Sequence, residues 1–260
     1  MNLNLSYCRT FKIQKMRLLY CLYQLCIAAP LLILATILTA IFTMVGTSIG
    51  NAHFWGYYPG RWWSKFFCWI LLLPVQVHGK ENVDNQTSYV FVANHQGFFD
   101  VFLIYGYLGR NFKWMMKRSL RKLPLVGKAC ESAKHIFVDN SSPSKTAKTI
   151  STARETLRDG TCLVVFPEGR RTETGKMGPF KKGAFQLAEE LQLPIVPMTI
   201  DGSWEVLPRT KGFNFVSWHR LKLTIHKPIL PTGNGQEDVK IIMQQAREAI
   251  NGALPTALQD

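Results

Sequence analysis

The chain has 260 residues, with 31 lysine and arginine residues against 17 aspartate and glutamate residues, which gives a formal net charge of +14. This length allows one substantial domain plus an additional segment, and the charge favours an anionic partner such as an acidic membrane surface or a phosphorylated substrate. The composition argues against a nucleic-acid-binding protein, because the aromatic residues cluster in apolar runs without a nucleic-acid fold signature, and the six cysteines contain no C-x2-C pair of the kind that binds a metal.

Residues 1–78 are expected to form a membrane-associated region with two helices. Residues 1–17 carry four basic and no acidic side chains, and residues 18–60 contain no Asp, Glu, Lys or Arg. A single helix over residues 18–49 would be about 48 Å long, whereas the hydrocarbon core of a bilayer is about 30 Å thick. Such a helix must tilt, kink at Pro30 or break. A second apolar run, residues 62–77, is short for a span and rich in tryptophan, which prefers the membrane interface.

The basic N-terminus is expected to stay in the cytoplasm. A single crossing would place the rest of the chain outside, whereas a helical hairpin, or two helices lying within one leaflet, would keep it on the cytoplasmic side. We therefore predict an integral or monotopic protein of the inner (cytoplasmic) membrane, with the active site facing the cytoplasm.

Residues 79–260 are expected to fold as a single α/β domain with a mainly parallel or mixed sheet flanked by helices. Short runs rich in Val, Ile and Phe are typical of strands, and they alternate with segments of helical periodicity, as in parallel sheets. The predicted strands are residues 89–93, 113–116, 135–138, 161–166, 194–200 and 221–226, and the predicted helices are residues 94–108, 144–157, 183–191 and 236–254.

The first candidate site lies in the stretch VFVANHQGFFD, residues 90–100. Asn94 is a candidate N-cap for the helix that follows the strand. His95 and Asp100 would lie roughly 140° apart on a regular helix, so they can meet only if His95 lies just outside it. A carboxylate bound to one imidazole nitrogen leaves the other nitrogen free to accept a proton, which makes a general base. The alternative is a capping histidine beside an unrelated surface aspartate.

The second candidate site follows the strand that ends at Phe166. It begins with Pro167 and continues through Glu168, Gly169, Arg170, Arg171 and Thr172, with Lys176, Lys181 and Lys182 close behind. A loop at the carboxyl end of a strand is a favoured ligand site in α/β folds, and arginine can bind a phosphate through two parallel hydrogen bonds. The alternative is a solvated basic loop beside an anionic membrane.

Four blocks, in this order, resemble the motifs of the glycerolipid acyltransferases, and in particular of the bacterial 1-acyl-sn-glycerol-3-phosphate acyltransferase branch. The blocks are Asn94-His95-x4-Asp100, Lys117-x2-Leu120-x3-Pro124-x2-Gly127, residues 166–172 (FPEGRRT), and Val196-Pro197-Met198. Two departures are that Gly97 stands where the family often has Ser, and Asn140 stands where many relatives have Arg. The second departure weakens the case for lysophosphatidate as the particular acceptor.

The resemblance implies a membrane-bound O-acyltransferase. It would move a fatty acyl group from acyl-CoA or acyl-carrier protein to the sn-2 hydroxyl of 1-acyl-glycerol-3-phosphate (lysophosphatidic acid), giving phosphatidic acid. His95 and Asp100 would form the general base, with no acyl-enzyme, no metal and no cofactor. Glu168, Gly169 and Arg171 would bind the acceptor, with Thr172 replacing the usual Ser and Lys117 as a further phosphate ligand. Asn94, Pro167 and Pro197 would shape the pocket.

Two alternatives remain open at this point. The same chemistry could serve another acceptor, such as glycerol-3-phosphate, another lysophospholipid or an amino-acid-derived lipid. A protein of a different class, a basic membrane-anchored protein that binds lipid headgroups without catalysis, would use the third block only as a headgroup site.

Overall fold

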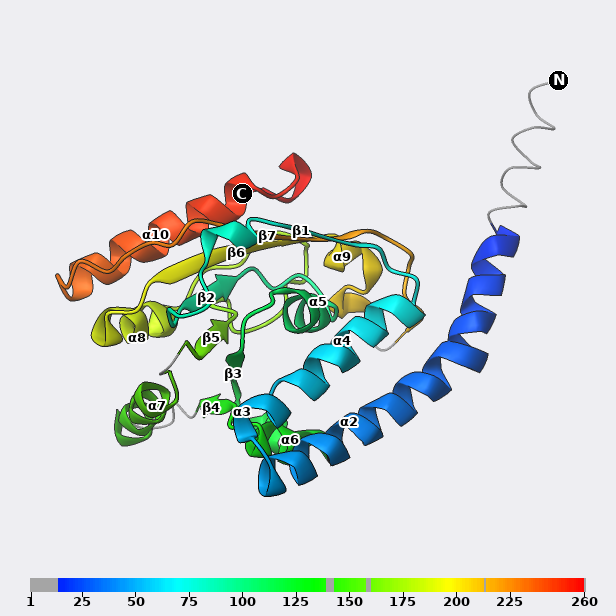
Figure 1. Ribbon diagram of the computed structural model, residues 1–260. Coiled ribbons are helices and arrows are strands. Elements are labelled where there is room, and N and C mark those ends of the chain that lie inside the picture. Colours follow the sequence, from blue (N-terminus) through cyan, green and yellow to red (C-terminus); the bar gives the residue numbers. More distant parts are fainter. Residues whose placement is uncertain (1–13, 139–142, 158–159, 213, 260) are drawn as a thin grey trace.

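The structure is a computed structural model that describes residues 14–138, 143–157, 160–212 and 214–259 (Figure 1). Its strands are β1 (Val75–His78), β2 (Val90–Ala93), β3 (Phe112–Lys117), β4 (Ile136–Val138), β5 (Cys162–Val165), β6 (Ile195–Asp201) and β7 (Leu221–Ile225). They form one seven-stranded sheet in the order β1-β7-β6-β2-β5-β3-β4. Strands β6, β2, β5, β3 and β4 are parallel, whereas β7 runs antiparallel to β6 and β1 runs parallel to β7. The predicted α/β class with a mixed sheet is confirmed.

Separate layers of helices cover the two faces of the sheet, because alternate residues of a strand point to opposite sides. In β2, Phe91 and Ala93 join one core, and Val90 and Val92 join the other. The first core is covered by α4 (Tyr58–Ile70) and α5 (Asp100–Tyr107), and the second by α7 (Pro143–Thr156), α8 (Gly183–Leu191) and α10 (Gln236–Gly252). Shorter elements are α3 (Ala52–Trp55), α6 (Val126–Ser132), α9 (Ser203–Val206), η2 (Lys80–Asn82), η3 (Arg118–Lys122), η4 (Arg209–Lys211) and η5 (Thr256–Leu258).

Two features of the sheet domain differ from the prediction. The helix after the first block begins at Asp100, so residues 94–99 are a loop and not the first turns of the helix. Strand β1 was not predicted, because residues 75–77 belong to the apolar run of residues 62–77 that was assigned to the membrane-associated region. It pairs with Leu221–Thr224 of β7. The division after residue 78 stays a prediction, and β1 lies on its N-terminal side.

Within the part of the chain that the structure describes, one helix, Gln14–Ile49, is long and apolar enough to cross a membrane, judged by length and composition. It contains a π-helical segment, η1 (Gln24–Ala28), and continues as α2 (Ala29–Ile49). Pro30 accounts for the wider turn, because it has no N–H for the carbonyl of Cys26 and its ring would press on that carbonyl. The helix therefore adjusts next to Pro30 and does not break.

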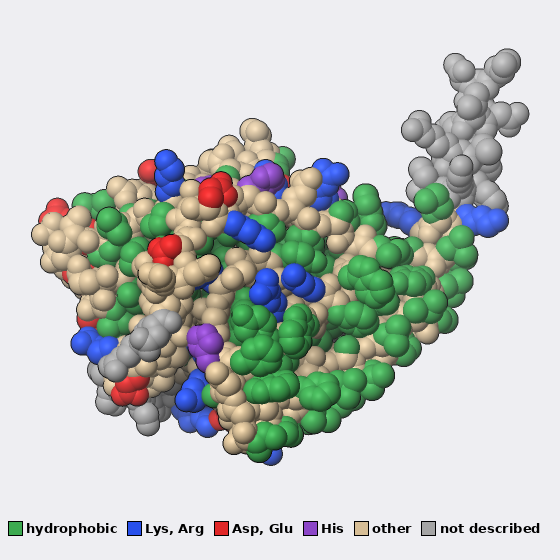
Figure 2. Space-filling model, viewed as in Figure 1, with side chains coloured by type: hydrophobic (Ala, Val, Ile, Leu, Met, Phe, Trp, Pro, Cys, Tyr) green, Lys and Arg blue, Asp and Glu red, His purple; other side chains and the backbone are tan. Residues whose placement is uncertain are grey.

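The N-terminal helix lies along the sheet domain and is attached to it through α4. The Tyr20 hydroxyl donates to the Leu71 carbonyl at 2.6 Å, and the Trp63 indole N–H donates to the Thr36 hydroxyl at 2.9 Å. The outward side of the helix carries exposed leucine and isoleucine side chains. Figure 2 shows them as a continuous hydrophobic band along one edge of the molecule. This surface supports membrane association.

Candidate active site

The first and third sequence blocks meet at the carboxyl edge of the sheet. Strands β2 and β5 are parallel neighbours, with Val92 opposite Val165, so the loops that follow them leave the same edge side by side. The His95 backbone N–H donates to Glu168 Oε1 at 2.7 Å, and the Thr172 N–H donates to the His95 carbonyl at 2.9 Å. Two blocks that are far apart in sequence therefore form one site.

His95 and Asp100 are in direct contact. His95 Nδ1 lies 2.7 Å from Asp100 Oδ2, and the Gly97 N–H donates to the same oxygen at 2.9 Å. Asp100 is fully buried at the first position of α5, whereas the His95 side chain is 17% exposed. The geometry is the one that the spacing required, with His95 in the loop before the helix. Among the residues that the structure describes, no partner is found for His95 Nε2, so this nitrogen can accept a proton from a substrate.

Phe166 holds the plane of the imidazole. The His95 and Phe166 rings stack with their centroids 3.9 Å apart and an interplanar angle of 8°, and Trp114 stacks on Phe166 at 5.5 Å. Sequence reasoning gave Phe166 no role of its own. The available signal was its position directly after β5, which matches the position of the His95 loop after β2.

Glu168 joins the loops instead of facing the solvent. Its second carboxylate oxygen, Oε2, accepts the Gly178 N–H at 2.7 Å, and the Gly178 carbonyl in turn accepts Arg247 Nη1 at 2.7 Å. Burial raises the pKa of the Glu168 carboxyl to about 7, although its two backbone hydrogen bonds act in the opposite direction. In this geometry Glu168 supports the His95 backbone and the third block, and its predicted contact with substrate remains a prediction.

Asn94 does not cap a helix, so that interpretation was wrong. Its side-chain Nδ2 donates to the Ile200 carbonyl at 2.9 Å, and its Oδ1 accepts the Ile200 N–H at 2.8 Å. The N-cap position of α5 is Phe99. Asn94 is buried, and beyond the end of β2 its side chain makes the hydrogen bonds to β6 that a strand backbone would otherwise make. Its structural role is therefore to fix the start of the His95 loop against β6.

Arg171 is half-buried beside this corner, and no partner for its guanidinium is found in the described part of the chain. The nearby carboxylate, Glu173, lies 3.2 Å from Arg209 Nη1 and 3.9 Å from Arg170 Nη1. Arg209 also donates to the Arg171 carbonyl, at 3.5 Å. Because its neighbours take up the acidic group, the Arg171 guanidinium is available for an anionic ligand.

The remaining predicted site residues lie around the same edge. Gly169 has φ +72°, a conformation that favours glycine, and a side chain there would press on the Lys181 ammonium. The Pro167 carbonyl accepts the Lys181 N–H at 2.9 Å, so it stabilises the third block through its backbone. Thr172 contributes its backbone N–H to His95, and its hydroxyl accepts the Thr174 N–H at 3.2 Å.

Two predicted residues are not in contact with this centre. Lys117 is exposed at the carboxyl end of β3, at the same edge as His95 but separated from β2 by β5. Pro197 is buried in the middle of β6, opposite Val92. Their roles as phosphate ligand and pocket wall stay predictions. Asn140, where the family pattern has a cation, lies outside the described residues.

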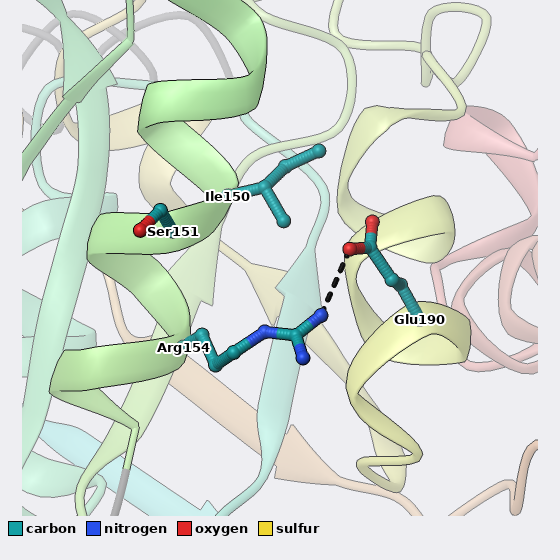
Figure 3. Close-up of a pocket in the computed structure, with 4 residues that line it drawn as sticks. All are labelled: Ile150, Ser151, Arg154 and Glu190. Atoms are coloured by element: carbon teal, nitrogen blue, oxygen red, sulfur yellow. Dashed lines mark hydrogen bonds and ion pairs between the residues drawn. The ribbon is translucent and has the colours of Figure 1, made fainter.

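A hollow elsewhere on the surface is separate from these blocks. It lies between α7 and α8, where an ion pair of 2.9 Å joins Arg154 to Glu190 beside Ile150 and Ser151 (Figure 3). It contains no histidine and no residue of the four blocks. Within the described ranges, no group of three or more His, Cys, Asp or Glu side chains could hold a metal ion. The absence of a cofactor stays a prediction.

A family model described as Acyltransferase matches residues 74–201. The 1-acyl-sn-glycerol-3-phosphate acyltransferase BAT2, chloroplastic, of Brassica napus is 31% identical over 170 residues, which are 64% of this chain and 49% of the relative. An uncharacterized acyltransferase of Schizosaccharomyces pombe, C1851.02, is 31% identical over 189 residues, which are 71% of this chain and 67% of that one. The chain spans about half the length of this Brassica napus relative and of two other curated relatives that it matches.

The fold is shared with a solved structure, the 1-acyl-sn-glycerophosphate (LPA) acyltransferase PlsC from Thermotoga maritima. The TM-score is 0.73 at 26% sequence identity, over 91% of this chain and 94% of the other. The similarity therefore extends over most of the chain. The chain belongs to the acyltransferase family, because it shares this fold and because acyltransferase relatives match it over most of its sheet domain.

Proposed function

We propose that this chain is a membrane-bound acyltransferase that moves a fatty acyl group from a thioester, acyl-CoA or acyl-carrier protein, to the sn-2 hydroxyl of lysophosphatidic acid, giving phosphatidic acid. The names of the Brassica napus relative and of the Thermotoga maritima structure support this acceptor. The observation that carries the proposal is the His95–Asp100 contact of 2.7 Å, joined by backbone hydrogen bonds to the loop that carries Arg171.

His95 acts as the general base. Nε2 takes the proton of the sn-2 hydroxyl while the hydroxyl oxygen attacks the thioester carbonyl. Asp100 holds the proton on Nδ1 and stabilises the imidazolium that forms. The tetrahedral intermediate then collapses, the C–S bond breaks, and the thiolate leaves with the proton from the imidazolium. The products are an ester and a free thiol, and no acyl-enzyme is formed.

Arg171 positions the acceptor. The hydroxyl and the phosphate of lysophosphatidic acid are separated only by two carbons and an ester oxygen, so their binding groups must also lie close together. The Thr172 N–H, directly after Arg171, is bonded to the His95 carbonyl at 2.9 Å. An arginine fork on the phosphate would therefore hold the hydroxyl in attacking range of the thioester.

The oxyanion of the intermediate needs hydrogen-bond donors, and backbone N–H groups near the His95 corner are candidates for that role. The N–H groups of His95, Gly97 and Phe98 already donate to Glu168, Asp100 and the Leu207 carbonyl. Of the four N–H groups from His95 to Phe98, this leaves that of Gln96. The Gln96 N–H is therefore our candidate donor at this corner.

The N-terminal helix supports a monotopic attachment. It contacts the rest of the fold near Tyr20, which bonds Leu71 directly after α4, and again near Gly46, which packs against Trp55 of α3. These positions are about 39 Å apart along a helix, more than the roughly 30 Å hydrocarbon core. A helix held to the domain over this length would lie in one leaflet, with its exposed side in lipid and His95 on the cytoplasmic side.

A thiol-release assay with oleoyl-CoA tests the proposal against its alternatives. Lysophosphatidic acid, glycerol-3-phosphate and a monoacylglycerol are compared as acceptors for the wild-type chain and His95→Ala. We expect the highest kcat/KM with lysophosphatidic acid and loss of turnover in the folded variant. Absence of turnover with every acceptor would favour a headgroup-binding protein, and wild-type turnover in His95→Ala would refute the base assignment.

A further inference from the structure

A second surface of the molecule combines positive charge with exposed apolar side chains. Residues 117–128, KRSLRKLPLVGK, contain five cations and no carboxylate. Four large apolar side chains of this basic apolar segment are exposed, from 38% for Val126 to 47% for Leu123, with Leu120 and Leu125 between them. The proposed acyl transfer uses only Lys117 from this segment, so it does not account for the leucines.

The backbone holds these side chains outward. After η3, the Leu123 N–H bonds the Leu120 carbonyl at 3.2 Å, and the Gly127 N–H bonds the Leu123 carbonyl at 2.9 Å. Leu125 has φ +59°, an unfavourable conformation for a residue with a side chain. At Gly127, a Cβ would collide with the Arg121 carbonyl, so the turn closes only with glycine. The exposed leucines therefore project from a tight, hydrogen-bonded turn.

The segment lies next to the N-terminal helix. It leads directly into α6, which packs against α2 (Figure 1). The two surfaces differ in charge, because α2 carries no Lys or Arg whereas the basic apolar segment carries five. Exposed leucines interspersed with lysine and arginine suit the boundary between acyl chains and anionic headgroups.

We propose that residues 117–128 form a second membrane contact, which inserts Leu120, Leu123 and Leu125 at the surface of an anionic bilayer while lysine side chains of the segment bind headgroup phosphates. Arg121 already pairs with Glu131 of α6. A second copy of the chain is a poorer occupant, since two such segments would face each other with like charges. If the proposed function holds, this contact also brings the carboxyl edge of β3, and with it the site at His95, to the surface that holds the lipid acceptor.

Hydrogen–deuterium exchange of the full chain tests this contact without any turnover. The chain is placed in nanodiscs of phosphatidylcholine alone and in nanodiscs that also contain phosphatidylglycerol. We expect the amides of residues 118–128 to exchange several-fold more slowly in the anionic discs, and the difference to shrink at high salt. The peptides of α10, which carry the exposed Ile241, should exchange equally in both.

The double variant Leu123→Ser/Leu125→Ser should lose this protection, whereas the control Ile241→Ser should keep it. All three side chains are exposed, so neither variant disturbs a core. Equal exchange of residues 118–128 in the two kinds of disc, or unchanged protection in the double variant, would overturn the proposal. Protection that increases with protein concentration in detergent would assign the surface to a second copy. If the chain shows this protection but has no acyltransferase activity, the proposed function is wrong and the membrane contact still holds.

Discussion

The contact between His95 and Asp100 makes Asp100→Asn the most informative substitution. In the wild-type chain, Asp100 Oδ2 accepts the Gly97 N–H at 2.9 Å and lies 2.7 Å from His95 Nδ1. In the variant, the Gly97 N–H selects the amide oxygen for this position, because an amide N–H there would face another donor. His95 would therefore keep its proton on Nδ1, and only the negative charge would be lost.

The size of the effect follows from this geometry. An imidazolium and a carboxylate about 4 Å apart attract each other by about 4 kcal/mol at an effective dielectric constant of about 20. Loss of that attraction in the transition state lowers kcat by about a thousandfold. Asp100→Ala should lose more, about ten-thousandfold, because both the Nδ1–H of His95 and the Gly97 N–H are then left without an acceptor.

The assay is thiol release at saturating oleoyl-CoA and lysophosphatidic acid, with near-ultraviolet circular dichroism as the control for folding. The ranking of the two variants tests the role of Gly97 directly. A kcat for Asp100→Asn within about tenfold of wild type would refute the charge argument. A kcat below that of Asp100→Ala would refute the orientation of the amide.

Three further substitutions test other contacts of the site. Glu168→Gln removes a carboxyl group from the site. Burial raises the pKa of this group from 4.5 to about 7, so the stability that it contributes is complete below about pH 4.5 and is lost as the pH rises to about 7. Relative to this variant, the wild-type chain should lose about 3 kcal/mol of unfolding free energy over that window, measured by urea unfolding in detergent; a pH-independent difference would contradict the assignment. Arg171→Lys should raise the KM for lysophosphatidic acid about tenfold and leave that for a monoacylglycerol unchanged; equal changes for both acceptors would move the phosphate site elsewhere. Asn94→Ala removes both hydrogen bonds to Ile200 and should cost about 3 kcal/mol in the same unfolding experiment, whereas a loss below about 0.5 kcal/mol would mean that the strand is held without it.

Glu168 connects the His95 loop, which follows β2, to the loop that follows β5. Its two carboxylate oxygens accept N–H groups from His95 and from Gly178, each at 2.7 Å. A longer or shorter side chain could not reach both groups at once, so Glu168→Asp should disturb the site even though the charge is kept. The glutamate that follows Pro167 thus acts first on the backbone of the His95 loop.

Several parts of this protein could be predicted from the sequence because the physics that decides them is local. The apolar runs of β2 and β5 indicate strands, and the helix at Gly183–Leu191 has the predicted bounds. The five-residue spacing of His95 and Asp100 already required His95 to lie outside the helix. These features depend on residues that are neighbours in the chain, so their patterns can be read directly.

The tertiary structure alone decided which segments meet. Strand β5 lies beside β2 although β3 and β4 come between them in sequence, and this order brings Glu168 and Phe166 to His95. The amide side chain of asparagine can cap a helix, and it can equally bond the backbone of a distant strand. Only the position of Ile200 in the tertiary structure shows that Asn94 has the second role. Long-range pairing depends on how whole strands share their buried faces, which no short stretch of sequence records.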